Sequence, residues 1–141
     1  MFPRTSLPKR AFTLIELLLV MVILVVLAGI ATPIYLNRAK DSKLQAASVA
    51  ISNIEQCLDT FEVDCGRLPT SSEGLAALLI APPNVQGWKG PYLKLDPLDP
   101  WKNPFVYRCP GQHNTATYDL SSNGPDGQEA TADDIGNWKQ E

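Results

Sequence analysis

The stretch from Asn123 to Ile135 contains several acidic side chains among residues that favour turns. It is the first of two candidate functional sites in this sequence. It includes Asp126, Asp133 and Asp134 but no His or Cys, and it shows no regular strand or helix pattern. Calcium binds six to eight oxygens, which flexible acidic loops supply, whereas zinc and copper prefer His or Cys. The spacing does not fit an EF-hand. From the residues alone, a solvated acidic loop is the simpler interpretation.

Glu16 is a second candidate because it lies in an apolar stretch. The residues from 17 to 31 carry no polar side chain, and an ionised carboxylate inside a membrane helix costs on the order of 2.5 to 3.5 kcal/mol. Such a carboxylate should have a partner. If the chain is cut between Ala11 and Phe12, the new amino terminus lies one helical turn from Glu16 and can supply the positive charge.

The residues around Glu16 predict a membrane helix that follows a cytoplasmic leader. About 20 helical residues cross the roughly 30 Å hydrocarbon layer, and the apolar stretch from 12 to 36 is long enough to do so. Three basic residues and no acidic residue precede it, which keeps the amino terminus in the cytoplasm and exports the rest of the chain. An ordinary secretory signal, cut after Gly29-Ile30-Ala31, is the competing interpretation.

The remaining composition disfavours several function classes. The chain has 141 residues, which fits one domain, and its net charge of -3 makes nucleic acid a poor partner. With one His, His113, most metal centres and His-dependent triads have almost nothing to build on. Cys57 and Cys65 would lie about 12 Å apart along a continuous helix, too far for a disulfide. Cys109 could meet either one, so a disulfide and free thiols both stay open.

A long amphipathic helix is the main predicted element. No Pro or Gly interrupts residues 34–65, so one helix should run from about 13 to 61 and stop at Gly66 and Pro69. Its exported half has an apolar stripe at helical spacing, which should dock the rest of the chain. The stripe consists of Ala47, Ile51, Ile54, Leu58 and Phe61.

Short elements should follow this helix. The spacing of Thr70 and Glu73 is that of a capping box, which predicts a short second helix that ends before Pro82. Three strands are expected at about 92–95, 104–109 and 116–121. The predicted fold class is therefore α+β, a long helix packed on a small antiparallel sheet.

The junction Lys9-Arg10-Ala11-Phe12-Thr13-Leu14-Ile15-Glu16-Leu17 resembles the type III signal of type IV pilins and type II secretion pseudopilins. Two further stretches, DPWKNPF at 99–105 and YDLSSNGPDG at 118–127, are similar to signatures of the major, G-type pseudopilins. The resemblance covers nearly the whole chain and implies a pilin-like fold. The sequence departs from the family pattern at Ala11 and Lys102, where Gly is usual.

The resemblance implies roles for individual residues. A prepilin peptidase would cut between Ala11 and Phe12 and methylate the amine of Phe12, and Glu16 would pair with the amino terminus of an adjacent subunit during assembly. It also implies a calcium site in the acidic loop. The matching ligands are the side chains of Asp126, Asp133 and Asp134 and the carbonyls of Asn123 and Gln128.

The expected organisation follows. A basic leader at 1–11 precedes a transmembrane and filament-core helix at 12–36, its amphipathic half at 37–65, and a periplasmic part at 66–141. Loss of the leader removes three basic residues, which changes the formal charge from -3 to -6. The expected function is that of a non-enzymatic subunit of the periplasmic pseudopilus, held in the inner membrane by a single span. Its partners would be copies of itself, minor pseudopilins, the prepilin peptidase, the inner-membrane assembly platform and the secretin.

Two rival functions share some of these features. A type IV pilin for adhesion, motility or DNA uptake would have the same leader and helix, but such pilins usually carry a disulfide-bounded carboxy-terminal loop. Here the last Cys is Cys109, and the acidic loop follows it. A membrane-anchored calcium-dependent binding domain that never polymerises would need neither Glu16 nor the junction at Phe12.

Overall fold

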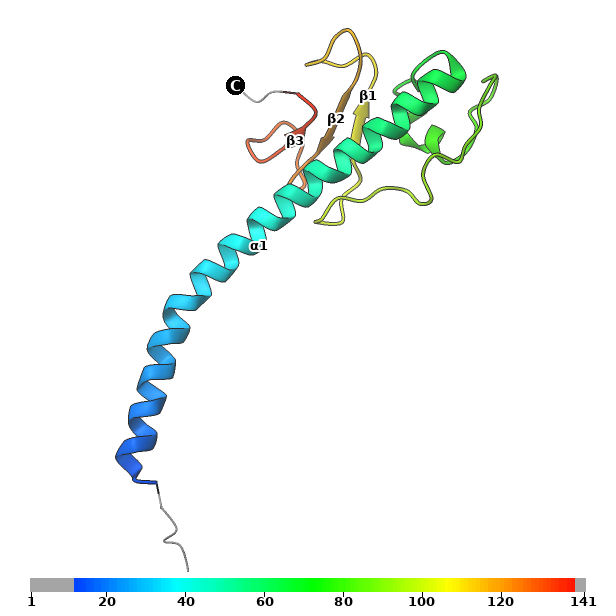
Figure 1. Cartoon of the computed structure of the whole chain (residues 1–141). Helices are drawn as coiled ribbons and strands as arrows, with labels where there is room; N and C mark the ends of the chain where they lie inside the picture. The colour runs from blue at the N-terminus through cyan, green and yellow to red at the C-terminus, as the bar shows by residue number, and fades with distance from the viewer. Residues whose placement is uncertain (1–11, 139–141) are drawn as a thin grey trace, which may run out of the picture. The chain divides into compact units, whose positions relative to one another are not determined.

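The computed structural model describes residues 12–138, in which one long helix precedes a small sheet (Figure 1). Helix α1 spans Leu14–Cys65, and a 3-10 helix, η1, spans Gly74–Leu78. The strands are β1 (Val106–Arg108), β2 (Asp119–Ser122) and β3 (Ile135–Gly136). The chain divides into two compact units within α1, between Ala39 and Lys40. The α+β class, with a long helix and a small antiparallel sheet, is confirmed.

The first unit is the amino-terminal part of α1. Every large apolar side chain that the structure describes from Phe12 to Ile30 is 49% to 81% exposed. Within residues 12–138, no helix meets the combined length and hydropathy that a membrane crossing requires. The membrane span expected over 12–36 stays a prediction.

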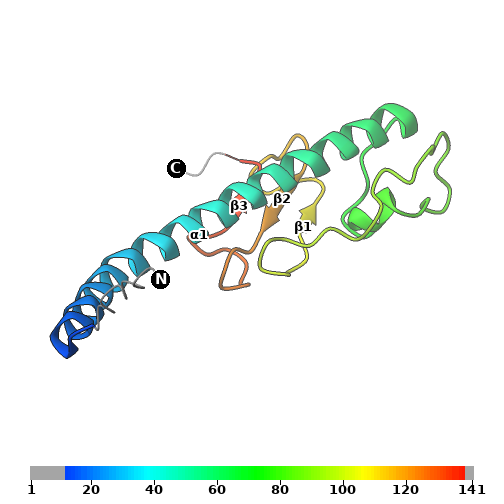
Figure 2. The same cartoon turned by 60° about the horizontal axis from the view of Figure 1, so that its bottom comes forward.

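The second unit is built on one face of the remaining part of α1, which lies beside the sheet in both views (Figures 1 and 2). All five residues of the predicted apolar stripe are buried, and Leu58 and Phe61 are fully buried. Complete burial of such a side chain contributes about 1.5 to 3 kcal/mol. Leu58 and Phe61 belong to one hydrophobic core, which also includes residues of η1 and the side chains of Phe105, Tyr107 and Leu120.

The sheet has the order β1-β2-β3 and is antiparallel throughout. Val106 lies opposite Ser121, and Ser122 lies opposite Ile135. The strands predicted at 104–109 and 116–121 are confirmed, although each is shorter than expected. The third strand is β3, in the segment for which no regular structure was expected.

The strand predicted at 92–95 was wrong. The backbone N–H groups of Tyr92 and Leu93 both donate to the carbonyl of Leu78, at 2.8 and 3.2 Å, instead of to a neighbouring strand. The Tyr92 ring packs edge-on against Phe61 at 5.8 Å and against Trp88 at 5.7 Å. Aromatic packing on the end of α1 therefore decides the path of this segment.

The capping box at Thr70 and Glu73 forms, but it does not begin an α-helix. The Thr70 N–H donates to Glu73 at 2.8 Å, and the Glu73 N–H donates to the Thr70 hydroxyl at 3.3 Å. Arg67 donates to both oxygens of Glu73 at 2.7 Å, and these bonds together with that from Thr70 lower the pKa of Glu73 to about 2. Gly74 then has a φ of 59°, a left-handed conformation that interrupts helical geometry, so the predicted second helix is reduced to η1.

The three cysteines are free. Cys57 and Cys65 both lie on the continuous α1, which confirms that they cannot bridge one another. The Cys57 thiol donates to the carbonyl of Tyr92 at 3.3 Å, and its burial raises its pKa. Cys109 is partly buried against the core rather than bonded to either of the others.

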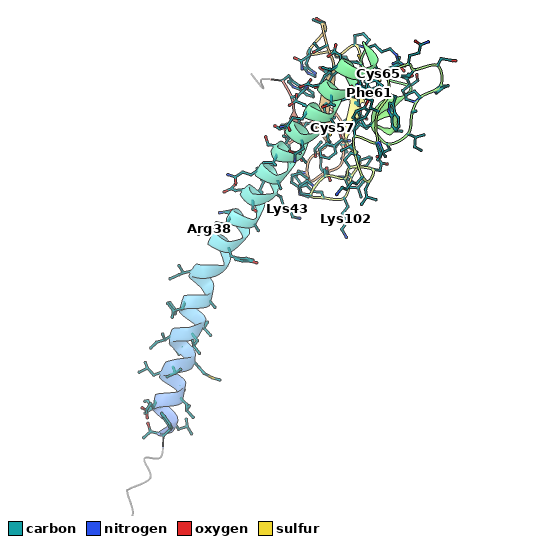
Figure 3. The ribbon with its side chains drawn as sticks, turned by 45° about the vertical axis from the view of Figure 1, so that its right-hand side comes forward. Arg38, Lys43, Cys57, Phe61, Cys65 and Lys102 are labelled. Carbon is teal, nitrogen blue, oxygen red and sulfur yellow. The ribbon has the colours of Figure 1, made fainter. Side chains whose placement is uncertain are left out.

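Lys102 occupies a turn in a conformation that favours glycine. Its φ is 73°, and its side chain is exposed at the edge of the second unit (Figure 3). The turn is closed by the Lys102 N–H, which donates to the Asp99 carbonyl at 2.9 Å, and by a bridge between Leu98 and Pro104. The left-handed requirement explains why Gly is usual at this position in the resembling family.

Lys102→Gly should stabilise the second unit by about 0.5 to 1 kcal/mol. A side-chain-bearing residue in the left-handed region costs roughly 1 to 2 kcal/mol, and the greater unfolded-state freedom of Gly offsets part of the gain. Thermal unfolding of the full chain in detergent, followed by near-ultraviolet circular dichroism, measures the change. Lys94→Gly is the matched control, because Lys94 is also exposed but has no positive φ, and it should not stabilise. An equal response of the two variants would contradict the strain at Lys102.

Candidate functional site

Phe12 and Glu16 lie at the start of α1, whereas Ala11 is outside the described residues. The Glu16 N–H donates to the backbone carbonyl and hydroxyl of Thr13, at 3.1 and 3.3 Å, so Thr13 caps the helix. Glu16 is in the first turn, where the helix dipole favours a negative charge. It is exposed, and among residues 12–138 it forms no ion pair. Within the described part of the chain, its charge is therefore left for a partner from elsewhere.

The acidic loop connects β2 to β3 and brings four of its five predicted ligand residues to a single hydroxyl. Thr131 Oγ1 lies 2.8 Å from Asp133 Oδ1 and 3.1 Å from Asp134 Oδ1. It also lies 3.2 Å from the Gln128 carbonyl oxygen and 3.5 Å from Asp126 Oδ1. A hydroxyl has one proton and can donate to only one of these four oxygens at a time. Three carboxylates and a carbonyl therefore surround a group that cannot satisfy them all.

Backbone N–H groups of the loop also donate hydrogen bonds to these carboxylates. The Gln128 N–H donates to Asp126 at 2.8 Å, and the Ala130 N–H donates to Asp134 at 2.8 Å. The hydrogen bond from Thr131 is the main cause of a lowered pKa at Asp133. Donors of the loop itself thus hold the three carboxylates close to one another.

Asn123, the fifth predicted ligand residue, is not among the groups that contact Thr131. Its side-chain Oδ1 is buried, and of the buried side-chain polar atoms that the structure describes it alone has no hydrogen-bond partner. Asn123 also lines a cavity of about 150 Å³, together with Glu129 and Asp134. Within residues 12–138, no three His, Cys, Asp or Glu side chains are arranged as a metal site, so calcium binding stays a prediction.

No sequence pattern identifies Thr131, and the contacts of His113, the single His of the chain, are also visible only in the structure. His113 Nδ1 lies 3.2 Å from Asp119 Oδ2, and its ring stacks on Trp138 at 4.0 Å with an angle of 2°. Burial raises the pKa of Asp119, but hydrogen bonds from the backbone of residues 112–114 and from the His113 ring outweigh it, so the pKa is lowered. No sequence pattern predicts these contacts, because Asp119 was assigned only to a strand.

A long helix that follows an amino-terminal processing signal and packs on a small sheet, with an acidic loop between two of its strands, defines a pilin-like subunit. Residues 7–32 match the prokaryotic N-terminal methylation motif, and residues 34–138 match the family described as type II secretion system (T2SS), protein G. The chain therefore belongs to the type II secretion system protein G family.

Individual relatives agree with this assignment. The type II secretion system core proteins G of Escherichia coli K12 and Pseudomonas aeruginosa are both 40% identical to the chain, over 134 and 137 residues. These alignments cover 92% of this chain and 91% and 95% of the relatives. The crystal structure of the major pseudopilin from the type 2 secretion system of enterohaemorrhagic Escherichia coli superposes with a TM-score of 0.65 at 32% identity. The superposition covers 72% of this chain and 87% of the Escherichia coli pseudopilin chain. The type IV pilin alternative is not favoured.

Proposed function

We propose that this chain is a structural subunit that polymerises into the periplasmic pseudopilus of a type II secretion system and supports protein export across the outer membrane. The match to protein G over residues 34–138, preceded by a methylation motif at 7–32, carries this proposal. Its partners would be other copies of itself, minor pseudopilins, the prepilin peptidase, the inner-membrane assembly platform and the secretin. No catalytic role is assigned to the chain.

Before assembly, we infer that residues 12–36 hold the subunit in the inner membrane, with the second unit in the periplasm. The exposed apolar side chains from Phe12 to Ile30 support this step, because so large an apolar surface is unfavourable in water. In a filament the same surface would pack against the helices of other subunits. One stretch of helix would thus face lipid first and protein later.

Processing should occur between Ala11 and Phe12. Ala is the smallest substitute for the usual Gly, so we expect cleavage to proceed, but more slowly. Intact-mass and peptide mass spectrometry of the chain purified from cells with the peptidase should find a methylated Phe12 at the amino terminus. Ala11→Gly, as the control, should give the same end with less unprocessed precursor. A mature chain that begins at Thr32 would instead establish an ordinary secretory signal.

Glu16→Ala should leave membrane insertion intact and reduce filament assembly at least tenfold. The carboxylate is costly in lipid, and a pair with a neighbour's amino terminus would replace that cost by a favourable interaction when the subunit enters the filament. Membrane fractionation measures insertion, and electron microscopy of sheared filaments measures assembly. Glu16→Asp, which keeps the charge, should retain part of the yield. Wild-type filament yield from Glu16→Ala would refute the role.

We further propose that the acidic loop binds calcium. The oxygens that surround Thr131 are ligands of the kind that a hard cation prefers. The buried Oδ1 of Asn123, at the start of the same loop, is a further oxygen without a hydrogen-bond partner. Bound calcium would neutralise the carboxylates. The chain's own part is to hold Asp126, Asp133 and Asp134 close together despite their repulsion, which is costly until a cation is present. Extracellular calcium sites have dissociation constants of about 0.1 to 1 mM, so such a site would fill only after export.

Asp126→Ala should abolish the stabilisation of the full chain by calcium. At 10 mM calcium, a site of this class adds roughly 1.4 to 2.7 kcal/mol to stability. The melting temperature of the wild type should therefore rise by several degrees between chelator and calcium, whereas that of Asp126→Ala should not change. Asp96→Ala removes an exposed carboxylate outside the loop and should keep the full shift. A wild-type shift in Asp126→Ala would exclude this site.

A further inference from the structure

Asp99 is a buried carboxylate that organises the turn before β1. It is 4% exposed. Its Oδ1 accepts the N–H groups of Trp101 and Asn103 at 2.9 and 2.8 Å, and its Oδ2 accepts the Ser122 hydroxyl at 2.6 Å. Both oxygens are thus bonded to other parts of the chain. A buried carboxylate with this many donors has a fixed position, since each donor would be left unpaired by a movement of the acid.

Ser122 transmits this fixed position to the acidic loop. It is fully buried at the end of β2, where it lies opposite Ile135 of β3, so this pair defines the two ends of the loop. Its hydroxyl donates to Asp99 and also accepts the N–H of Gly124 at 3.2 Å. A hydroxyl can do both at once because it has one proton and two lone pairs. A continuous hydrogen-bonded chain therefore runs from Asp99 through Ser122 to Gly124.

The Gly124 N–H belongs to the same peptide plane as the carbonyl of Asn123, one of the proposed calcium ligands. Because a peptide bond is planar, fixing the direction of the N–H also fixes the direction of that carbonyl. The next peptide is held as well, since Asn103 donates from its side chain to the Gly124 carbonyl at 3.4 Å. The turn at 99–103 is therefore connected to the first peptide plane of the loop through Ser122 and contacts the second directly through Asn103.

Gly124 also brings this first part of the loop against its last part. Its φ is 63°, and a Cβ at this position would lie 2.4 Å from the backbone oxygen of Asp133 and 2.9 Å from its carboxylate. Only glycine permits this approach. Asn123 and Asp133 lie ten residues apart in sequence. Gly124, whose N–H is bonded to Ser122, brings the two ends of the loop that contain them close together.

We propose that Asp99 and Ser122 are positioning residues of the acidic loop, which set the Asn123 carbonyl and the adjoining Asp133 before a cation arrives. This inference rests on the proposed calcium binding for its function. The order of the loop that it describes exists without the ion. The turn at 99–103 and the loop are then one cooperative unit, so calcium should also protect the turn, because coupling between two sites is reciprocal.

Ser122→Ala tests the proposal in the full chain in detergent. The change removes one oxygen, and leaves the Gly124 N–H and Asp99 Oδ2 without their partner. Ser71→Ala is the matched control, because the Ser71 hydroxyl also makes two bonds, to the carbonyl and N–H of Cys109 at 3.0 and 2.8 Å, but neither reaches the loop. Both variants should lose stability, Ser71→Ala less because Ser71 is exposed whereas Ser122 is fully buried. Exchange in the loop is therefore compared with exchange in the rest of the same chain, which reports any general weakening of the fold.

Two measurements distinguish the variants. In chelator, hydrogen exchange of peptides that span 123–134 should be at least fivefold faster in Ser122→Ala than in wild type and unchanged in Ser71→Ala. In calcium titrations followed by calorimetry, Ser122→Ala should bind about five- to tenfold more weakly, the effect of losing one hydrogen bond, and Ser71→Ala should bind as the wild type does.

The outcomes separate this proposal from the one on which it rests. Unchanged loop exchange in Ser122→Ala would overturn the positioning role whatever calcium does. Faster loop exchange in a chain whose wild type binds no calcium would retain the positioning role and overturn the calcium site. Faster exchange with unaltered calcium affinity would also overturn the proposal, since the fixed carbonyl would then contribute nothing to the ligand set.

Discussion

The burial of one face of α1 against the sheet is the interaction on which the rest of the second unit depends. The three strands have three, four and two residues, and strands this short do not form a stable core by themselves. Leu58 and Phe61 supply the apolar surface that they lack, and Phe105, Tyr107 and Leu120 pack on it. Tyr107 also donates to the carbonyl of Pro69 at 2.8 Å, which ties β1 to the segment after the helix. The sheet of the second unit is therefore held by the helix on which it packs.

A second constraint is the repulsion among the carboxylates of the acidic loop. The loop keeps Asp126, Asp133 and Asp134 together by surrounding them with donors, of which Thr131 is the most central. Its two ends are fixed by the pairing of Ser122 with Ile135. Directly after β3, the Asn137 N–H donates to the Leu120 carbonyl at 3.0 Å. The ends of the loop are thus part of the sheet, while its middle is exposed. Order at the ends and several carboxylates in the middle are the conditions under which a cation gains most by binding, since little conformational entropy remains to be lost.

Much of this could be predicted from the sequence where a period or a specific motif was present. The stripe from Ala47 to Phe61 follows helical spacing, and every member is buried. The strand expected at 92–95 failed because Tyr92 is used as an aromatic contact to α1, which local propensity does not reveal. Strand β3 was missed because Ile135 and Gly136 are too few to show alternation, and their pairing depends on Ser122, thirteen residues earlier. The role of Thr131 arises from a tertiary arrangement of loop oxygens, and a threonine in a turn carries no signal for it.

The two units differ in how far they bury their apolar and charged side chains. This difference fits a subunit whose amino-terminal part is buried only in an assembly. The second unit buries its own core and satisfies even a buried carboxylate, Asp99, with three donors. The amino-terminal part of α1 instead exposes its apolar side chains and, among the described residues, leaves Glu16 without an ion pair. No rearrangement within one helix can bury a surface that lies on all its sides, because a helix has no interior for side chains. The missing contacts must therefore come from lipid or from other helices. A processed amino terminus on a neighbouring copy would supply in one contact the charge that Glu16 lacks and the apolar surface that surrounds it.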